Sequence, residues 1–404
     1  MSSSSILAGC LVLFIGLPFA LAASSTSSGL RYIEGTRPVG MSAAVVVEDQ
    51  ALAHTSQVFA SGPKGEPPSG AAEAQVERTL DNLAAALGAA GSGFDRIVKI
   101  NVYVVQTVVT DLVEKALVRR FSGAARPAVT LMEGKLPIAG ALVAMDAIAA
   151  APAAGAEVVR RTVRGFRSAE GERHVAILPA GPAVFISGYA EPGDPQKAAR
   201  ATMSRLGTAL ELLDLQKSDV VQVKAFVATA TDPEVVRNEI RRFFGDRDVP
   251  PLVLLEWRTT GRAVEIELSA AARRRTKEQA PMAIEYITPP GETANPYFTR
   301  LVRVNRGRLI FTAGLFGRTE REAEAQIRDI YSQLRDILQQ AGSSFDQMVK
   351  ATYYVADSSA STLLNPIRRE LYPPQRPPAA SKINVAGTGR KEKTITLDMI
   401  AGAP

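Results

Sequence analysis

The sequence predicts an α+β protein built from three tandem copies of one domain, and three observations support this. The 404 residues are 46% hydrophobic and 22% charged, which is typical of a folded chain. The segment Ala90–Lys99 recurs as Ala341–Lys350, with seven identities in ten positions at an offset of 251. Near half that offset, Val220–Val227 matches Ile97–Val104 at an offset of 123. Length alone allows two or three domains, and the repeat favours three.

A helix with one apolar stripe precedes each repeated segment. The stripe residues are Val76, Leu80, Leu83 and Leu87 in copy one, Ala199, Met203, Leu206 and Leu210 in copy two, and Ile327, Tyr331, Leu334 and Leu338 in copy three. Spacings of four, three and four place these side chains on one helix face. We expect that face to pack against a sheet.

The other elements follow in the same order in each copy. The repeated segment is β-rich, and a second helix follows it over residues 111–121, 233–244 and about 361–371. Prolines then precede a further strand, and an alternating strand ends each copy over residues 142–148, 264–268 and 394–400. Each copy begins with hairpin-like strands, which are clearest at Leu301–Val304 and Leu309–Thr312. The predicted order is β-β-α-β-α-β-β, with both helices on one face of the sheet.

The N-terminus predicts a cleavable export signal over residues 1–23. An apolar run from Ile6 to Ala22 ends in Ala20-Leu21-Ala22, which fits a signal-peptidase site. A lipoprotein anchored through Cys10 and an uncleaved anchor are the alternatives. The three domains then occupy residues 24–158, 159–279 and 280–404. We expect a chain exported to the periplasm or beyond the cell, with no stable membrane span after removal of the signal.

Composition excludes several classes of function. Two histidines and one cysteine rule out most His/Cys zinc sites, disulfide frameworks and thiol catalysis, so we expect no metal and no cofactor. The formal net charge is +6, which only weakly favours an anionic partner. Basic residues gather in the two linkers, at Arg160–Arg167 and Arg273–Lys277, and no aromatic residues interleave with them in stacking register. We therefore expect solvated linkers and no nucleic-acid partner.

Several short motifs resemble the reactive intermediate deaminase (Rid or RidA, YjgF-like) family, which has a chorismate-mutase-like fold. They are Val98-Lys99 and Val349-Lys350 in the repeated strands, Pro127-Ala128 and Pro378-Ala379, Met145–Ala149, and Asn295-Pro296-Tyr297. The resemblance covers nearly all of the chain after the signal, three times over. It implies trimers with small-molecule clefts between neighbouring subunits. Three copies in one chain then predict an intramolecular pseudo-trimer that is a monomer, because separate domains would expose three apolar sheet faces.

The resemblance also implies an arginine directly after Pro-Ala, which holds a substrate carboxylate in the family's deaminases. The matching positions here are Val129, Leu252 and Ala380. None is cationic, which puts the family's usual 2-imino acid deamination in doubt.

Candidate site residues follow from the same resemblance. The acids on the last strand are the catalytic candidates, with structural ion pairing as the alternative: Asp146, Glu267 and Asp398. The candidate ligand-binding residues are Tyr297, Lys382, Arg126, Arg376 and His54. The three clefts are not equivalent, and we expect the one that uses Tyr297, Lys382 and Asp398 to be functional.

Three functions remain open. The first is binding of a small-molecule ligand in the interdomain clefts. The second is hydrolysis of an imine or enamine, with a cleft acid positioning water. The third is a structural or partner-binding role, with the clefts filled by side chains such as Leu252 and Leu254.

Overall fold

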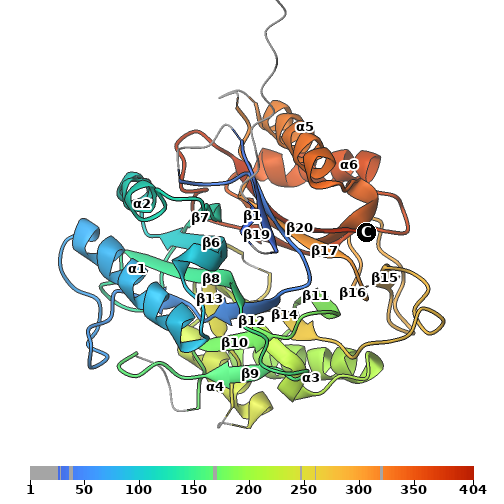
Figure 1. Ribbon diagram of the computed structural model, residues 1–404, viewed down its shortest axis with the longest axis horizontal. Coiled ribbons are helices and arrows are strands. Elements are labelled where there is room, and N and C mark those ends of the chain that lie inside the picture. Colours follow the sequence, from blue (N-terminus) through green and yellow to red (C-terminus); the bar gives the residue numbers. More distant parts are fainter. Residues whose placement is uncertain are drawn as a thin grey trace, which may run out of the picture.

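The computed structural model describes residues 26–27, 29–35, 40–166, 171–245, 248–259, 261–318 and 322–404. Within these ranges the chain forms three mixed β-sheets, with a pair of α-helices covering the outer face of each (Figure 1). The α+β class is confirmed. The predicted export signal at residues 1–23 lies outside the described ranges. No helix within them is long and apolar enough to cross a membrane.

Each copy contributes one pair of helices and four main strands in the same order. Copy one has β4 (Ala51–Thr55), α1 (Ala72–Ala89), β6 (Ile97–Val104), α2 (Thr107–Arg120), β7 (Ala128–Glu133) and β8 (Val143–Ala151), with a short β5 (Val58–Phe59). Copy two has β11 (Ala183–Tyr189), α3 (Pro195–Leu212), β12 (Val220–Ala228), α4 (Pro233–Phe244), β13 (Leu252–Trp257) and β14 (Val264–Ala271). Copy three has β17 (Arg308–Thr312), α5 (Ala323–Ala341), β18 (Met348–Val355), α6 (Ser358–Leu371), β19 (Ala379–Asn384) and β20 (Ile395–Ala403).

The helices form where the sequence predicts them. Aspartate side chains cap α3, α4 and α6 by accepting backbone N–H groups, at Asp194, Asp232 and Asp357. Two helices end at glycines with positive φ, Gly245 after α4 and Gly342 after α5. All twelve predicted stripe residues are buried, which confirms that these faces pack against the sheets.

The hairpins predicted at the start of each copy do not form. Strand β16 (Leu301–Val304) pairs with β11 of copy two instead of with β17. Likewise β10 (Val175–Leu178) pairs with β4 of copy one, and β17 pairs with the N-terminal strand β3 (Ala44–Val47). The hairpin prediction was wrong because closely related copies offer equivalent partners, and proximity in sequence does not choose between them.

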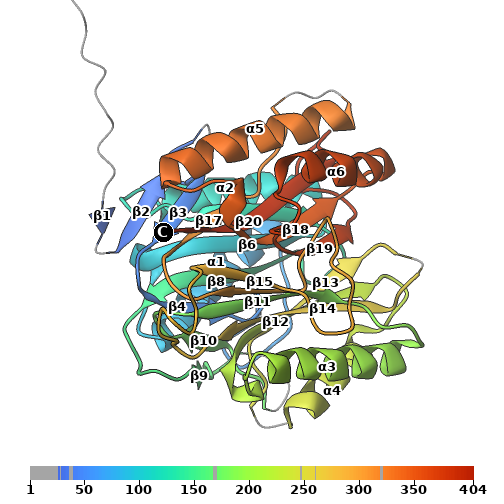
Figure 2. The ribbon, with the colours of Figure 1, turned by 90° about the vertical axis from the view of Figure 1, so that its right-hand side faces the viewer.

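This strand exchange runs in a ring and closes the molecule. The outer strands β9 (Val159–Arg161), β15 (Ile284–Ile287) and β2 (Leu30–Ile33), with the short β1 (Thr26–Ser27), continue the exchanged edges. In Figure 2 the blue strands β2 and β3 lie beside β17 and β20 from the other end of the chain. The N-terminal strands therefore complete the sheet of copy three.

The inner faces of the three sheets share one core, which confirms the intramolecular pseudo-trimer. One apolar cluster joins Val98, Val221 and Val349, at equivalent positions of the three copies, with Phe185 and Phe311. A second cluster joins Tyr103, Phe226 and Tyr354, again one from each copy, with neighbours that include Trp257. The strand positions between these clusters carry polar side chains.

Candidate functional site

Charged side chains from all three copies meet between the two central clusters. Lys99 Nζ lies 2.6 Å from Asp398 Oδ1, which joins copies one and three. Lys350 forms an ion pair with Glu267, which joins copies three and two. At the third boundary the position of Lys99 is taken by Gln222, which donates to the carbonyl oxygen of Thr55 at 2.9 Å. The ring of ion pairs is thus broken between copies two and one.

Asp146, the acid left over at that boundary, accepts neutral donors from its own copy. Asn101 Nδ2 donates to Asp146 Oδ2 at 2.9 Å, and the Tyr103 hydroxyl donates to Oδ1. Asp146 and Glu267 are at most 1% exposed. The three predicted catalytic acids therefore lie together on the central axis and act as buried counter-ions.

Lys224 supplies the third positive charge on the axis. It is 6% exposed and forms no hydrogen bond or ion pair with any residue of the described ranges. Burial alone would lower the pKa of Lys224, but the charges of Tyr354 and the three acids outweigh it and raise that pKa. We refer to Lys99, Lys224, Lys350, Asp146, Glu267 and Asp398 as the axial charge layer.

His54 also faces the axis. It occupies the strand position that Phe311 has in copy three, as their pairing with Ile148 and Ile400 shows. The side chain is 3% exposed, and neither ring nitrogen has a hydrogen-bond partner within the described ranges. Burial, with the charges of Lys350 and Lys224, lowers the pKa of His54 to about 3. It is a neutral core side chain at physiological pH.

Two of the three boundaries between copies are bridged by a backbone hydrogen bond. Where β4 meets β13, Gln57 N–H donates to the Leu252 carbonyl oxygen at 3.0 Å. The cavity beside this bond is about 40 Å³, room for about one water. Where β17 meets β7, Gly314 N–H donates to the Val129 carbonyl oxygen at 3.0 Å, and a Cβ on Gly314 would lie 3.0 Å from Thr130 Cγ2.

The third boundary, where β11 meets β19, holds reactive groups, and we call it the β11–β19 cleft. Ser187 Oγ accepts the Ala380 N–H at 2.7 Å, and Arg300 donates to the Gly188 carbonyl oxygen at 3.2 Å. A bulge in β11 between Ile186 and Tyr189 places Gly188 against the Glu265 carboxyl, where no side chain would fit.

A cavity of about 290 Å³ opens beside Arg300. The guanidinium of Arg300 stacks on the rings of Tyr189 and Phe298, at 4.6 and 4.8 Å. Glu292 accepts from both Arg300 and Arg205, at 2.9 and 2.6 Å. The cavity lining is therefore charged, and its residues come from copy two and from the segment before β16.

Glu265 is the main residue that sequence reasoning missed. Burial raises its pKa to about 7, with a further contribution from the charge of Glu267, while Ser381 and Arg300 oppose the shift. A carboxyl with this pKa can hold or release a proton near neutral pH. One signal was available, since Glu265 and Glu267 are two residues apart and point to the same face of one strand.

The raised pKa predicts a pH-dependent stability. The folded chain binds more protons than the unfolded chain between the ordinary pKa of 4.5 and about 7, so this contribution is complete below 4.5 and is lost as pH rises through 7. Glu265→Gln keeps the side chain neutral at every pH. We expect its melting temperature to gain on the wild type between about pH 5 and 8. Scanning calorimetry measures this difference, and a constant difference across that range would contradict the assignment.

The predicted trio Tyr297, Lys382 and Asp398 is not brought together. Lys382 pairs with Tyr353 and Asp398 with Thr352, so the two side chains lie on opposite faces of the sheet. Lys382 lies on the helix side, where its Nζ donates to the Ser361 carbonyl oxygen at 3.3 Å. The guanidinium of Arg368 lies 5.3 Å from the ring of Tyr297 on that side, while Asp398 is on the axis.

The two remaining candidates lie near the rims of the sheets. Arg126 forms an ion pair with Glu34 at 2.9 Å, and both side chains are exposed. Arg376 is exposed in the segment before β19. Among the described residues no group of three or more His, Cys, Asp or Glu side chains is placed to hold a metal ion.

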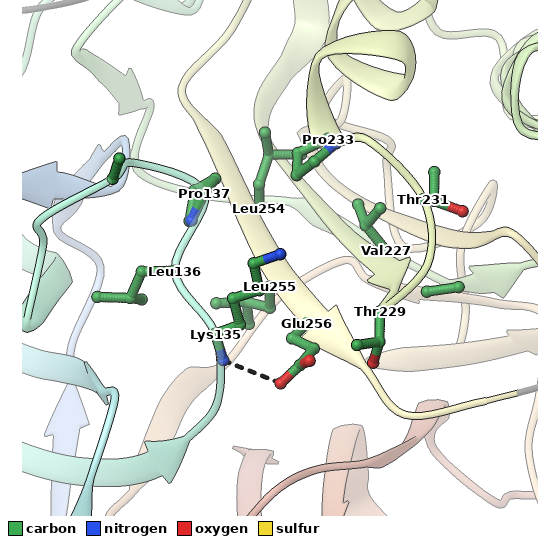
Figure 3. Close-up of a pocket in the computed structure, with 12 residues that line it drawn as sticks. Lys135, Leu136, Pro137, Val227, Thr229, Thr231, Pro233, Leu254, Leu255 and Glu256 are labelled. Carbon is green, nitrogen blue, oxygen red and sulfur yellow. Dashed lines mark hydrogen bonds between the residues drawn. The ribbon is translucent and has the colours of Figure 1, made fainter.

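A second, mainly apolar cavity of about 240 Å³ lies between copies one and two (Figure 3). Leu136 and Pro137 come from the segment after β7, and Leu254 and Val227 come from copy two. Its one carboxylate, Glu256, accepts the backbone N–H of Lys135 at 2.9 Å. This cavity suits an apolar group, and it offers less chemistry than the β11–β19 cleft.

Comparison with known proteins agrees with this architecture. The family model for endoribonuclease L-PSP matches residues 42–151 and 290–402, which is more than half of the chain and corresponds to copies one and three. No curated protein matches the chain.

Similar solved structures each correspond to about one copy. A YjgF family member from Neisseria meningitidis is 22% identical and covers 30% of this chain and 95% of its own, with a TM-score of 0.23. The Rid family protein YyfB from Yersinia pestis is 23% identical and covers 30% and 99%, with a TM-score of 0.28. The match of the family model over more than half of the chain shows that the chain belongs to the endoribonuclease L-PSP family.

Proposed function

We propose that the chain is exported and binds a small metabolite in the β11–β19 cleft. The observation that carries this proposal is the grouping of Glu265, Ser381 and Arg300, because Arg300 also lines a cavity of about 290 Å³ and burial raises the pKa of Glu265 to about 7. Concave sites with a few convergent polar groups and a perturbed pKa are typical of ligand sites. The other two boundaries offer no comparable group.

The ligand is not held by the arginine that the family's deaminases use. Val129, Leu252 and Ala380 occupy the matching positions and are 0%, 6% and 8% exposed. Any ligand must therefore be held by other residues, which explains why the three clefts have diverged.

A hydrolytic activity on an imine or enamine is the second candidate, and the pKa of Glu265 favours it. Water would add to the imine carbon while its protons pass to the nitrogen; the carbon–nitrogen bond then breaks, releasing ammonia and leaving a carbonyl. A carboxyl that titrates near pH 7 can accept and return a proton in these steps.

RNA cleavage, which the name of the family model suggests, has less support. The guanidinium of Arg160 in the first basic linker forms an ion pair with Asp248 at 2.6 Å and donates to several backbone carbonyl groups. These contacts engage the guanidinium of Arg160 within the protein, so it is not available to bind a phosphate group.

Ammonia release from 2-iminobutanoate, combined with calorimetric titration of 2-oxobutanoate, tests the proposal. We expect 2-oxobutanoate to bind the wild type. If the chain is a hydrolase, Glu265→Gln should lower ammonia release by about a hundredfold. Glu256→Gln is the matched control, because that glutamate lies in the cavity of Figure 3. Loss of 2-oxobutanoate binding in Glu256→Gln but not in Glu265→Gln would place the ligand in the cavity of Figure 3. That result would contradict the proposal.

A further inference from the structure

We infer that Arg368 and Lys382 form a binding site for a small oxyanion, of which a carboxylate is the best fit, on the helix side of the β11–β19 cleft. The inference deepens the proposed function, on which it rests, by giving the ligand a charge and an anchor. Neither residue belongs to the family motif that supplies the usual arginine.

Arg368 is buried without a counter-ion. It projects from α6, is 4% exposed, and its Nε has no hydrogen-bond partner. No acidic side chain forms an ion pair with it among the residues that the structure describes. Isolated buried charges are unfavourable, so charged groups in proteins are usually paired.

Lys382 adds a second cation at the same place. Its only hydrogen bond within the described ranges is the 3.3 Å contact with the Ser361 carbonyl oxygen. Burial and the neighbouring charge of Arg368 lower the pKa of Lys382. Two adjacent cations without an acid repel each other, and an anion bound between them would remove that repulsion.

The surroundings orient the guanidinium for binding. Arg368 stacks between the rings of Tyr297 and Tyr353, at 5.3 and 4.8 Å, which fixes its plane and leaves its edge to donate. Tyr297 is half-buried, and its ring carries a hydroxyl group that can donate a hydrogen bond.

Ala380 lies two residues before Lys382 and therefore faces the same side of β19. Ala380 is buried in the apolar cluster on this face, so Lys382 is the charged residue of β19 there. Two cations, one tyrosine hydroxyl and no acid match a small oxyanion, and the planar guanidinium fork matches a carboxylate best.

Calorimetric titration of the full chain with sodium propanoate, inorganic phosphate and neutral propanamide tests the inference. We expect propanoate to bind and propanamide not to bind. Lys382→Gln should weaken propanoate binding by at least about tenfold. Arg369→Gln removes an exposed cation from the next position on α6 and should leave the affinity unchanged.

Arg368→Gln should abolish propanoate binding if the variant folds. If it does not fold, Lys382→Gln still tests the site, because Lys382 is only half-buried. Tighter binding of phosphate than of propanoate would support the site and assign it a phosphoryl ligand. Equal propanoate affinity in the wild type and Lys382→Gln would overturn the inference. The two claims can fail separately. If Glu265→Gln still binds propanoate and also leaves 2-oxobutanoate binding and turnover unchanged, Glu265 has no role in the proposed function. The oxyanion site would then still stand.

Discussion

Replacement of Lys224 by methionine is expected to lower the free energy of unfolding by about 3–5 kcal/mol, the range for leaving a buried charge uncompensated. Methionine keeps most of the volume of the lysine but removes its charge. Three carboxylates, the buried Asp146 and Glu267 and the half-buried Asp398, would then share the two remaining lysines of the axial charge layer. Asp146 would be affected most, because its hydrogen bonds come from neutral donors.

Urea unfolding measures this loss. Lys277→Met, which removes an exposed lysine from the second linker, is the control and should change stability by less than about 0.5 kcal/mol. Adding Asp146→Asn to Lys224→Met rebalances the charge and should recover part of the loss, as a double-mutant cycle would show. A Lys224→Met variant as stable as the wild type would mean that the acids on the axis do not need this counter-ion.

Replacement of Val45 by proline is expected to weaken copy three rather than copy one. Val45 lies opposite Phe311 of β17 and Tyr32 of β2. Proline inside a central strand removes a ladder hydrogen bond and strains the pairing. The damage should therefore appear at β17, more than 250 positions away in the sequence.

Hydrogen exchange followed by mass spectrometry distinguishes the two possible partners of β3. We expect amides of Leu309–Thr312 to exchange at least about tenfold faster in Val45→Pro, while β4 stays protected by β8 and β10. Val302→Pro in β16 is the matched variant at the edge of copy two and should act on β11 and β15. Fast exchange at β4 with a protected β17 would show that hairpins form within each copy after all.

Local periodicity explains what could be predicted from the sequence. The stripe of Leu80, Leu83 and Leu87 identifies a helix face, and similar stripes at constant offsets identify three copies. These patterns depend only on neighbours along the chain. The partner of β3 does not, because β4 and β17 are equivalent strands and only the closed ring selects β17.

The candidate site could be predicted only in part, because strand alternation gives the face of a residue and not its neighbours across copies. Asp398 was expected in a cleft with Tyr297 and Lys382, but it lies on the axis, where it pairs with Lys99. Glu265 was hidden by the repeat itself, since the aligned positions hold Ala144 and Thr396. Arg368 lies on a helix, where a charged residue is expected at the surface, yet it is 4% exposed.

The number of 2-oxobutanoate molecules bound per chain tests most directly whether the β11–β19 cleft is the functional site. The other two boundaries are bridged by the backbone hydrogen bonds of Gln57 and Gly314, and the cavity of Figure 3 is mainly apolar. Isothermal titration calorimetry should therefore give one molecule per chain, and Lys382→Gln should weaken that binding. Three equivalent sites per chain, or a single site that Lys382→Gln and Glu265→Gln both leave unchanged, would contradict this assignment.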